Sequence, residues 1–427
     1  MNYRGLRIMG GIGITGLVLL GLMGCIQAVS QEQTTPFSQP TPQTEHLAMQ
    51  KSPEIDPQLV AANTQFGFKL FSEILKQDRN KNIFVSPSSV AIALAMTYNG
   101  ASGETQKAMA KALELNGMSL QALNQANANL KELLQNPDPK VQLAIANSIW
   151  ARQDVSFKPD FMQRNQTFYG AEIANLNFND PKSKSIINGW VKDNTRGKIE
   201  EIIDSINPRD VLFLINAIYF KGDWTKPFDK KLTAEKPFYR PDGSSKQHPL
   251  MSQRGEFRYF ETDRFQAVSL PYGEGQRMSM DILLPKKPYS ASDFYQDLTA
   301  ENWQQWVTRF RSRPGTVQIP RFKLEYDIEL KRTLSALGMA VAFDGSRSDF
   351  SGISSTPTRI NQVKHKTFVE VNEEGTEAAA VTSIGIRATS AIVDEPFSMV
   401  VDRPFFCTIR DNRSGTVVFM GAIVDPQ

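Results

Sequence analysis

Apolar residues recur at helical spacing in the first part of the chain. Phe66, Leu70 and Ile74 lie on one face of a predicted amphipathic helix. The run 90–96 is apolar nearly all round, which predicts a buried central helix that follows an N-cap at Ser86. Further helices are predicted at 102–113, 120–134, 160–168, 184–194 and 328–337.

Strand patterns dominate the later part of the chain. The unbroken apolar run 211–220 predicts a strand that is buried on both faces. Other strands are predicted at 278–284, 316–319 and 367–371, and the runs 405–410 and 416–423 form a predicted hairpin. Because helices come first and strands follow, instead of alternating regularly, the pattern favours an α+β fold.

The segment 372–393 has the two-residue period of a strand but no obvious partner. One row is uncharged and consists of Thr376, Ala378, Ala380, Thr382, Ile384, Ile386 and Ala388. The other row carries both charges and consists of Glu377, Ala379, Val381, Ser383, Gly385 and Arg387. A strand of this kind is suited to joining an existing sheet. The alternative is a surface loop of small residues, since Gly375 and Gly385 weaken strand propensity.

Composition and charge exclude several classes of protein. The chain has 427 residues, 41% of them hydrophobic and 22% charged, so it can bury a large core. Its net charge is only +3, and Arg4 and Arg7 at the N-terminus supply two of these charges. The sequence therefore predicts no nucleic-acid partner. No linker-like composition follows residue 55, which predicts one large domain over 56–427.

The N-terminus resembles a bacterial lipoprotein leader. Arg4 and Arg7 precede an apolar run over 8–23, and Leu22-Met-Gly-Cys25 resembles the lipobox in which the leader is cut before cysteine. We expect a signal peptide over 1–24, a lipid on Cys25 and a flexible tether over 25–55. The expected location is the cell envelope outside the cytoplasm, with the lipid as the only membrane contact. An uncleaved anchor or an ordinary secretory leader are the alternatives, and both export the chain.

Candidate catalytic chemistry is sparse. With Cys25 lipidated, Cys407 is the one remaining cysteine, so we expect no internal disulfide and a buried, inert thiol. The motif G-x-G-x-x-G at 11–16 lies in the leader and is a coincidence. Histidines occur only at 46, 248 and 365, without the spacing of a metalloprotease, and G-x-S-x-G is absent. The sequence therefore predicts no enzyme, no metal site and no cofactor.

Four stretches, at 82–89, 216–224, 365–380 and 402–405, resemble the serpin family, the serine protease inhibitors, in the family's order. The resemblance covers the chain from about residue 56 to the end. It implies three β-sheets, eight or nine α-helices and an exposed reactive-centre loop. A protease that attacks this loop forms an acyl-enzyme, and the cleaved loop then inserts into the central sheet as a new strand. The native state is expected to be metastable.

The resemblance assigns roles to particular residues. The hinge of the loop corresponds to Glu373, Gly375, Thr376, Glu377, Ala378, Ala379, Ala380 and Val381. Its small residues favour an inhibitor over a non-inhibitory binding or chaperone-like lipoprotein. A buried network beneath the sheet, called the shutter, corresponds to Ser86, Ser89, Asn216 and His365. Trp224 and Arg321, together with Glu373, correspond to the breach, the point where the loop enters the sheet.

The resemblance also places the cleaved bond. The acyl-side residue usually lies about sixteen positions after the hinge glutamate, which predicts Thr389-Ser390. A small β-branched residue there favours an elastase-like serine protease. Arg387-Ala388 is the alternative and implies a trypsin-like protease. We expect the inhibitor to be a monomer.

Overall fold

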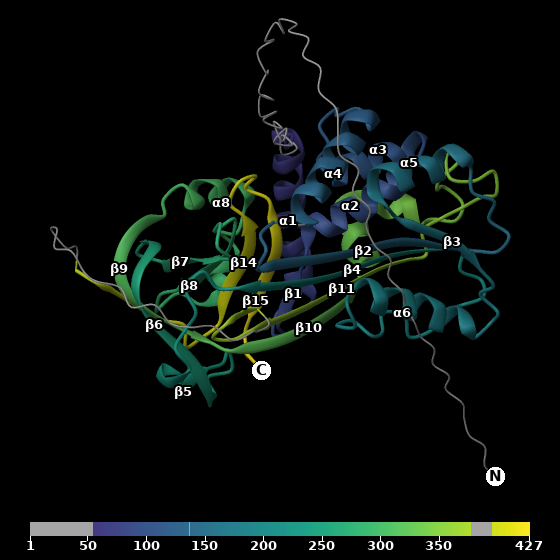
Figure 1. Ribbon diagram of the computed structural model, residues 1–427. Helices are drawn as coiled ribbons and strands as arrows, with labels where there is room; N and C mark the ends of the chain where they lie inside the picture. The colour runs from purple at the N-terminus through teal and green to yellow at the C-terminus, as the bar shows by residue number, and fades with distance from the viewer. Residues whose placement is uncertain (1–53, 136, 377–394) are drawn as a thin grey trace, which may run out of the picture. The chain divides into compact units, whose positions relative to one another are not determined.

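The computed structural model describes residues 54–135, 137–376 and 395–427, which belong to one compact unit. These residues contain nine α-helices and fifteen β-strands, so the predicted α+β class is confirmed (Figure 1). The helices are α1 Pro57–Gln77, α2 Pro87–Tyr98, α3 Gly103–Ala112, α4 Leu120–Gln135, α5 Pro159–Tyr169, α6 Lys182–Asn194, α7 Ala291–Tyr295, α8 Ala300–Val307 and α9 Lys331–Leu334.

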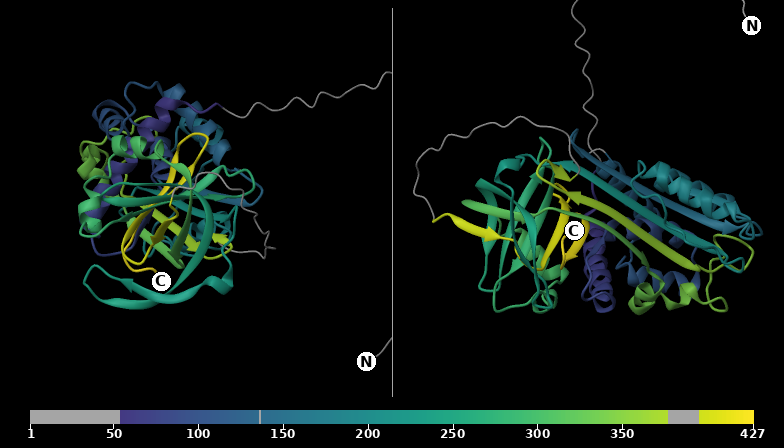
Figure 2. Two further views of the ribbon diagram at one scale, coloured as in Figure 1. Left: turned by 90° about the vertical axis from the view of Figure 1, so that its left-hand side faces the viewer. Right: turned by 90° about the horizontal axis from the view of Figure 1, so that it is seen from below.

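A six-stranded sheet has the strand order β10-β11-β12-β4-β2-β3. Its strands are β2 Val141–Arg152, β3 Glu172–Leu176, β4 Leu212–Asp223, β10 Phe322–Glu329, β11 Gln362–Val371 and β12 Gly375–Thr376. Strand β4 confirms the fully buried strand predicted at 211–220, because apolar residues cover both of its faces. Strands β4 and β11 also pair directly with each other along most of their length. Figure 2 shows from below how β4, β11 and β10 run side by side.

A second set of nine hydrogen-bonded strands follows the order β1-β15-β14-β8-β7-β6-β9-β13, with β5 paired to β6. The strands are β1 Ile83–Val85, β5 Ala234–Tyr239, β6 Ser245–Glu261, β7 Phe265–Tyr272, β8 Met278–Pro285, β9 Arg311–Pro320, β13 Phe397–Val400, β14 Phe405–Asp411 and β15 Val417–Ile423. Strand β6 pairs with β5 through its first part and with β7 through its last four residues. Three sheets were expected, and the six-stranded sheet is one of them. The other two share the long strand β6, so among the described residues they are hydrogen-bonded into one set of strands.

Helices cover both faces of the six-stranded sheet, as Figure 1 shows. Helix α2 is buried along its whole length and contacts β4, β2 and β15, as the all-round apolar run predicted. On the opposite face, Ile187 and Val191 of α6 pack with Phe213 and Ile215 of β4 in a separate apolar cluster. No helix in the part of the chain described has both the length and the hydropathy of a membrane span.

Two local predictions require correction. The helix predicted over 328–337 is wrong at its start, because Ile328 belongs to β10 and pairs with His365 of β11. The helical turns begin only at Lys331, and Gly338 takes a positive φ of 100° beyond them. Ser86 does hold the N-cap position of α2, but its hydroxyl makes no cap bond and donates instead to Val418 O (2.6 Å).

Candidate functional site

The 372–393 segment enters the six-stranded sheet at its first residues. Gly375 and Thr376 form β12 and pair in antiparallel fashion with β4, through Gly375↔Asp223 and Thr376↔Gly222. Thr376 also pairs with Val371 of β11. The start of the predicted strand therefore already lies between β4 and β11. The predicted hinge residues 377–381 and both candidate cleavage bonds lie outside the described residues.

A tight turn brings β12 back from β11. The Asn372 amide donates to Gly375 O (2.8 Å), and the Asn372 side-chain oxygen accepts bonds from the amides of Glu374 (3.0 Å) and Gly375 (3.3 Å). Gly375 has a φ of 155° and lies so close to β4 that an added Cβ would approach Gly222 O to 2.1 Å. Only glycine fits here, because the obstructing atoms belong to the backbone.

We expect Gly375→Ala to displace β12 from between β4 and β11. The new methyl group would overlap Gly222 O and the Asp223 Cα, which cannot turn aside as a flexible side chain can. Hydrogen exchange of the Thr376 amide should accelerate, and the apparent melting temperature should fall by a few degrees, as for an overpacking cost of about 1–3 kcal/mol.

Gly255→Ala provides a matched control for this substitution. Gly255 also lies in a strand, β6, but a Cβ built there meets no atom within 4 Å. This variant should melt like the parent protein. Equal protection of the Thr376 amide in Gly375→Ala and in the parent would contradict the close fit.

The Glu373 carboxylate is the centre of the cluster at the breach. It accepts bonds from the Arg321 guanidinium (Nε, 2.8 Å) and from the Thr233 hydroxyl (2.5 Å), and its side chain is almost wholly buried. Burial alone raises the pKa of Glu373, but the bonds from Arg321 and Thr233 outweigh it, so the pKa lies below its usual value. Glu373 therefore stays ionised and anchors the turn that precedes β12.

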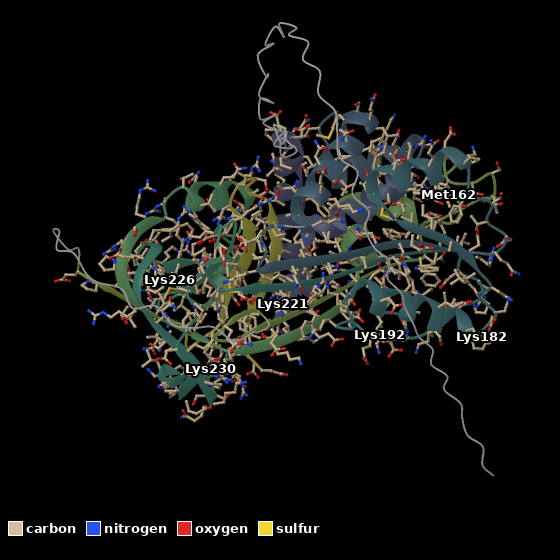
Figure 3. The ribbon with its side chains drawn as sticks, in the orientation of Figure 1. Met162, Lys182, Lys192, Lys221, Lys226 and Lys230 are labelled. Atoms are coloured by element: carbon tan, nitrogen blue, oxygen red, sulfur yellow. The ribbon has the colours of Figure 1, made fainter. Side chains whose placement is uncertain are left out.

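Hydrogen bonds from the segment 224–228 to backbone carbonyls hold the same turn. The Trp224 indole N–H donates to Asn372 O (2.9 Å), the Trp224 amide to Glu374 O (2.9 Å) and the Phe228 amide to Glu373 O (2.8 Å). Lys230, labelled in Figure 3, adds an ion pair with Glu374 (2.5 Å). The structure thus brings Trp224, Arg321 and Glu373 together around this turn.

Thr376 faces the core through a contact that the sequence did not indicate. Its side chain is 0% exposed, and its hydroxyl lies 2.9 Å from the hydroxyl of Tyr272 on β7. The Tyr272 ring stacks on Trp224 with centroids 4.3 Å apart. Burial raises the pKa of Tyr272 well above its usual value, so this phenol is neutral. Either hydroxyl can therefore be the donor in the bond between Tyr272 and Thr376.

A buried network of neutral polar groups links β4 and β11 further down. The Asn216 side-chain nitrogen donates to Ser89 Oγ (2.5 Å) and to the side-chain oxygen of Asn147 (2.5 Å). The Asn216 oxygen lies 2.6 Å from His365 Nδ1, and the Ser86 amide donates to His365 Nε2 (3.0 Å). The four residues predicted for the shutter therefore meet in one network, and Asn147 is a fifth member.

These contacts determine the protonation of His365. Because Nε2 accepts from a backbone amide, Nδ1 carries the single ring proton and donates it to Asn216. Burial lowers the pKa of His365 to about 3. The imidazole is therefore neutral in the folded protein. Protonation of Nε2 would place a second N–H donor against the Ser86 amide N–H and break that hydrogen bond.

We expect the native fold to lose stability as the pH falls below about 6.5. The folded pKa of His365 lies below that of the unfolded chain, so the unfolded chain binds more protons between pH 6.5 and about 3. The contribution of His365 to the free energy of unfolding is complete above pH 6.5, and each pH unit below that lowers it by up to about 1.36 kcal/mol. Melting curves at pH 7.5, 6.5, 5.5 and 4.5 measure this loss.

His365→Gln isolates this contribution, because burial also lowers the pKa of His248. Glutamine offers one oxygen to the Ser86 amide and one N–H to Asn216 without titrating. Its melting temperature should fall less steeply with acid than that of the parent protein. Parallel curves for the two proteins would assign the acid sensitivity to other groups.

Helix α6 and the connection that follows it, which includes residues 201–203, cover the line along which β4 and β11 pair. The Asn188 side-chain oxygen accepts bonds from the amides of Ile202 (3.0 Å) and Ile203 (3.0 Å), which ties this connection to α6. Lys366 of β11 donates to Glu201 O (2.6 Å) in the same connection. A strand that enters between β4 and β11 must therefore pass beneath this cover.

Sequence reasoning missed Asn147, Thr233, Asn372 and Tyr272, which complete these two clusters. Tyr272 and Thr376 are 104 residues apart in sequence, and neither lies in a pattern that points to the other. Asn147 interrupts the mostly apolar strand β2, and a lone buried amide of this kind is the one local indication of a polar partner.

Comparisons with known proteins agree with this arrangement. A family model described as "Serpin (serine protease inhibitor)" matches residues 61–426. Serpin B8 of Homo sapiens is 35% identical over 377 residues, which cover 86% of this chain and 99% of that protein. The leukocyte elastase inhibitor of Bos taurus is 36% identical over 388 residues, which cover 86% of this chain and all of that protein.

A solved structure shares the fold described above. The crystal structure of tengpin, a thermophilic serpin in the native state, superposes with a TM-score of 0.81 at 33% identity. The match covers 88% of this chain and 96% of that chain. A family match over most of the chain, joined to relatives above 30% identity along their whole length, shows that the chain belongs to the serpin family.

Proposed function

We propose that this protein inhibits serine proteases as a suicide substrate. The observation that carries the proposal is the position of β12, which begins the insertion of the 372–393 segment between β4 and β11. The family description and a relative named as a leukocyte elastase inhibitor support the same activity. The protein is then an inhibitor and not a catalyst.

The register of β12 indicates where the rest of the segment would go. Extending its antiparallel pairing residue by residue places the last paired position at Gly385, opposite Gln362 and Phe213. Both candidate bonds, Thr389-Ser390 and Arg387-Ala388, lie just beyond this end. Cleavage at either bond therefore frees enough chain to fill the whole space between the two strands.

The same register assigns faces to the two rows of side chains. Ala378 and Ile384 would lie beside Val369 and Leu214, which belong to the main core cluster. Val381 would lie beside Ala217, in the apolar cluster beneath α6. The uncharged row thus meets the larger core, and the small side chains of the other row fit under the helix.

Sheet geometry supplies a reason why insertion is favourable. Strands β4 and β11 pair in parallel fashion over seven positions, from Phe213↔Gln362 to Tyr219↔Phe368. A strand inserted between them is antiparallel to both, as β12 already is. Insertion therefore replaces one parallel ladder by two antiparallel ladders, which are more stable per residue.

The buried network is expected to change when the segment inserts. The extended register places Thr382 opposite both His365 and Asn216, whose side chains now bond directly to each other. Insertion at this point separates the pair, and the Thr382 hydroxyl is placed to bond the released groups. The network thus stabilises the uninserted sheet until cleavage supplies a replacement strand.

The proposed chemistry follows the ordinary course of a serine protease. The protease serine attacks the carbonyl carbon of Thr389, the Thr389-Ser390 peptide bond breaks, and the new amine of Ser390 takes the proton. An ester then joins Thr389 to the protease. At about 3.4 Å per residue, the thirteen residues from Glu377 to Thr389 would carry the protease about 44 Å as they extend β12, before water hydrolyses the ester.

Incubation with an elastase-like and a trypsin-like protease tests this function. We expect a complex that survives denaturing electrophoresis and a released C-terminal peptide whose mass locates the bond. A peptide beginning at Ser390 supports the elastase-like target, and one beginning at Ala388 supports the trypsin-like target. Quantitative cleavage without any stable complex would show that the protein is a substrate only.

The alternative is a binding or chaperone-like member of the family that does not inhibit. Heat resistance separates the two possibilities. A loop-cleaved inhibitor should melt at a much higher temperature than the intact protein, because the inserted strand completes the sheet. A cleaved protein that melts with the intact one would favour the non-inhibitory alternative.

We also propose that the protein is a lipoprotein anchored outside the cytoplasm. The leader-like sequence over 1–24 and the resemblance of Leu22-Met-Gly-Cys25 to a lipobox support this proposal, and the family match begins only at residue 61. Cells that express the full chain should incorporate labelled palmitate into it and retain it in the membrane fraction. Cys25→Ser should abolish labelling, and continued labelling of that variant would refute the assignment.

A further inference from the structure

A cavity of about 290 Å³ lies behind the segment that holds the hinge. Its walls come from the segment 224–228 and from the strands β6, β7 and β8. Trp224, Phe228 and Phe257 give it three aromatic side chains with Leu270 beside them, and most of the other lining residues are polar or charged. This size is at the lower end of ligand pockets, about 300–1,000 Å³, and suits a molecule of one or two rings.

Two polar atoms in the lining have unused hydrogen-bonding capacity. Ser269 is 1% exposed, and its hydroxyl has no partner within the described residues. The side-chain oxygen of Asn412 likewise has none there, although its nitrogen donates to Gln276 O (2.7 Å) and Ser279 Oγ (2.7 Å). Buried polar groups without partners are rare, because each is destabilising. Both oxygens are covered by their neighbours, so each side chain must turn toward the cavity to reach a ligand. Together they can then give one hydrogen bond to a ligand acceptor and take one from a ligand donor.

The rim of the cavity is positively charged. Lys226 and Arg258 are exposed there, and neither forms an ion pair with any residue that the structure describes. Figure 3 shows Lys226 on the side of the molecule formed by β6 to β9. Glu256 is the one acidic residue of the lining, and its carboxylate accepts a bond from Ser312 (3.2 Å). The excess of cations favours an anionic group at the mouth.

We propose that this cavity binds a small aromatic anion that also carries a hydrogen-bond donor. The rings pack against Trp224, Phe228 and Phe257, and the anionic group lies between Lys226 and Arg258. Deeper in the cavity, the ligand accepts a bond from the Ser269 hydroxyl and donates one to Asn412. The inference does not depend on the protease-inhibitor function, since binding is measured directly.

The position of the cavity gives a second way to observe binding. On one side of the segment 224–228, the backbone amides of Trp224 and Phe228 donate to the carbonyls of Glu374 and Glu373. Trp224 and Phe228 also line the cavity. A ligand that packs on these rings restrains the segment. Hydrogen exchange of these two amides should therefore slow when the ligand is bound.

The probe for the test is 6-hydroxynaphthalene-2-sulfonate, a fluorescent two-ring aromatic sulfonate that carries an O–H donor. Titration of the full-length protein should give one saturable site, and 4-hydroxybenzoate should compete for it. Arg258→Gln removes a charged bond at an exposed position and should weaken binding about tenfold. Ser269→Leu should block the site by filling the cavity.

Arg254→Gln is the matched control, because Arg254 is also exposed on β6 but does not line the cavity. It should bind the probe like the parent protein. Equal weakening by Arg254→Gln and Arg258→Gln would show non-specific attraction to positive charge and overturn the proposal. Unchanged binding in both Arg258→Gln and Ser269→Leu would do the same.

Discussion

Thr376→Arg is expected to convert the inhibitor into a substrate. Thr376 is 0% exposed, its backbone pairs on both sides, and its hydroxyl contacts Tyr272 in a stack with Trp224. An arginine at this position would place a charge in the buried site beside Tyr272 and Trp224, at a penalty of about 3–5 kcal/mol. The arginine should therefore leave the sheet, and insertion would have to bury it again. Since about 1.4 kcal/mol is tenfold in rate, insertion should slow by about 100-fold or more, and hydrolysis of the acyl-enzyme should occur first.

The measurement is the stoichiometry of inhibition, the number of inhibitor molecules consumed for each protease molecule trapped. It should rise at least about tenfold in Thr376→Arg, and electrophoresis should show cleaved protein in place of the complex. Thr376→Ser keeps the hydroxyl next to Tyr272 and should inhibit like the parent protein. An unchanged stoichiometry in Thr376→Arg would mean that insertion does not require residue 376 to lie between β4 and β11.

The second large effect is expected from Asn216→Ala. Asn216 bonds to Ser89, Asn147 and His365 at once, and all of these groups are buried. Its removal leaves the His365 N–H and the Asn147 oxygen without partners, at about 1–3 kcal/mol each. We expect the apparent melting temperature to fall by about 4–8 °C. Because insertion breaks the same bonds, the intact variant should also lose inhibitory activity faster on standing.

Melting curves and residual inhibition after incubation at 37 °C measure the two effects. Asn194→Ala is the control, since Asn194 is exposed at the end of α6 and bonds only to Trp190 O among the described residues. It should change neither property. If Asn216→Ala melted normally and kept its activity, the network would not be what holds β4 and β11 together.

Local patterns in the sequence predicted much of the fold correctly. The apolar run 211–220 became the buried strand β4, and the all-round apolar run 90–96 became the buried helix α2. Cys407 is buried as a free thiol, as expected. These predictions succeeded because periodicity and hydropathy are properties of neighbouring residues and need no knowledge of distant partners.

Predictions failed where a distant strand competes with a local preference. The pattern over 328–337 is helical, yet Ile328 pairs with His365 and the strand β10 continues through Glu329. Ser86 has the right position to cap α2, but Val418 O takes its hydroxyl. In both cases a long-range hydrogen bond replaced the local one that the pattern favours.

The candidate site shows the same division. Resemblance to a family identified Trp224, Arg321 and Glu373, and the structure brings these three together. It gave no indication of Tyr272 or Thr233, because hydrogen bonds between distant residues leave no period in the sequence. The cavity beside Trp224 was equally invisible, since its walls come from separate strands that meet only in the folded protein.

By itself, the sequence determined that the 372–393 segment alternates like a strand, with an uncharged row suited to a core. Only the tertiary structure decided where that strand begins. Thr376 lies between β4 and β11 because Gly375 allows the backbone to approach Gly222, and because the Glu373 carboxylate is held by Arg321 and Thr233. Alternation is a property of one strand, whereas a place in a sheet depends on the free hydrogen-bonding edges of two others.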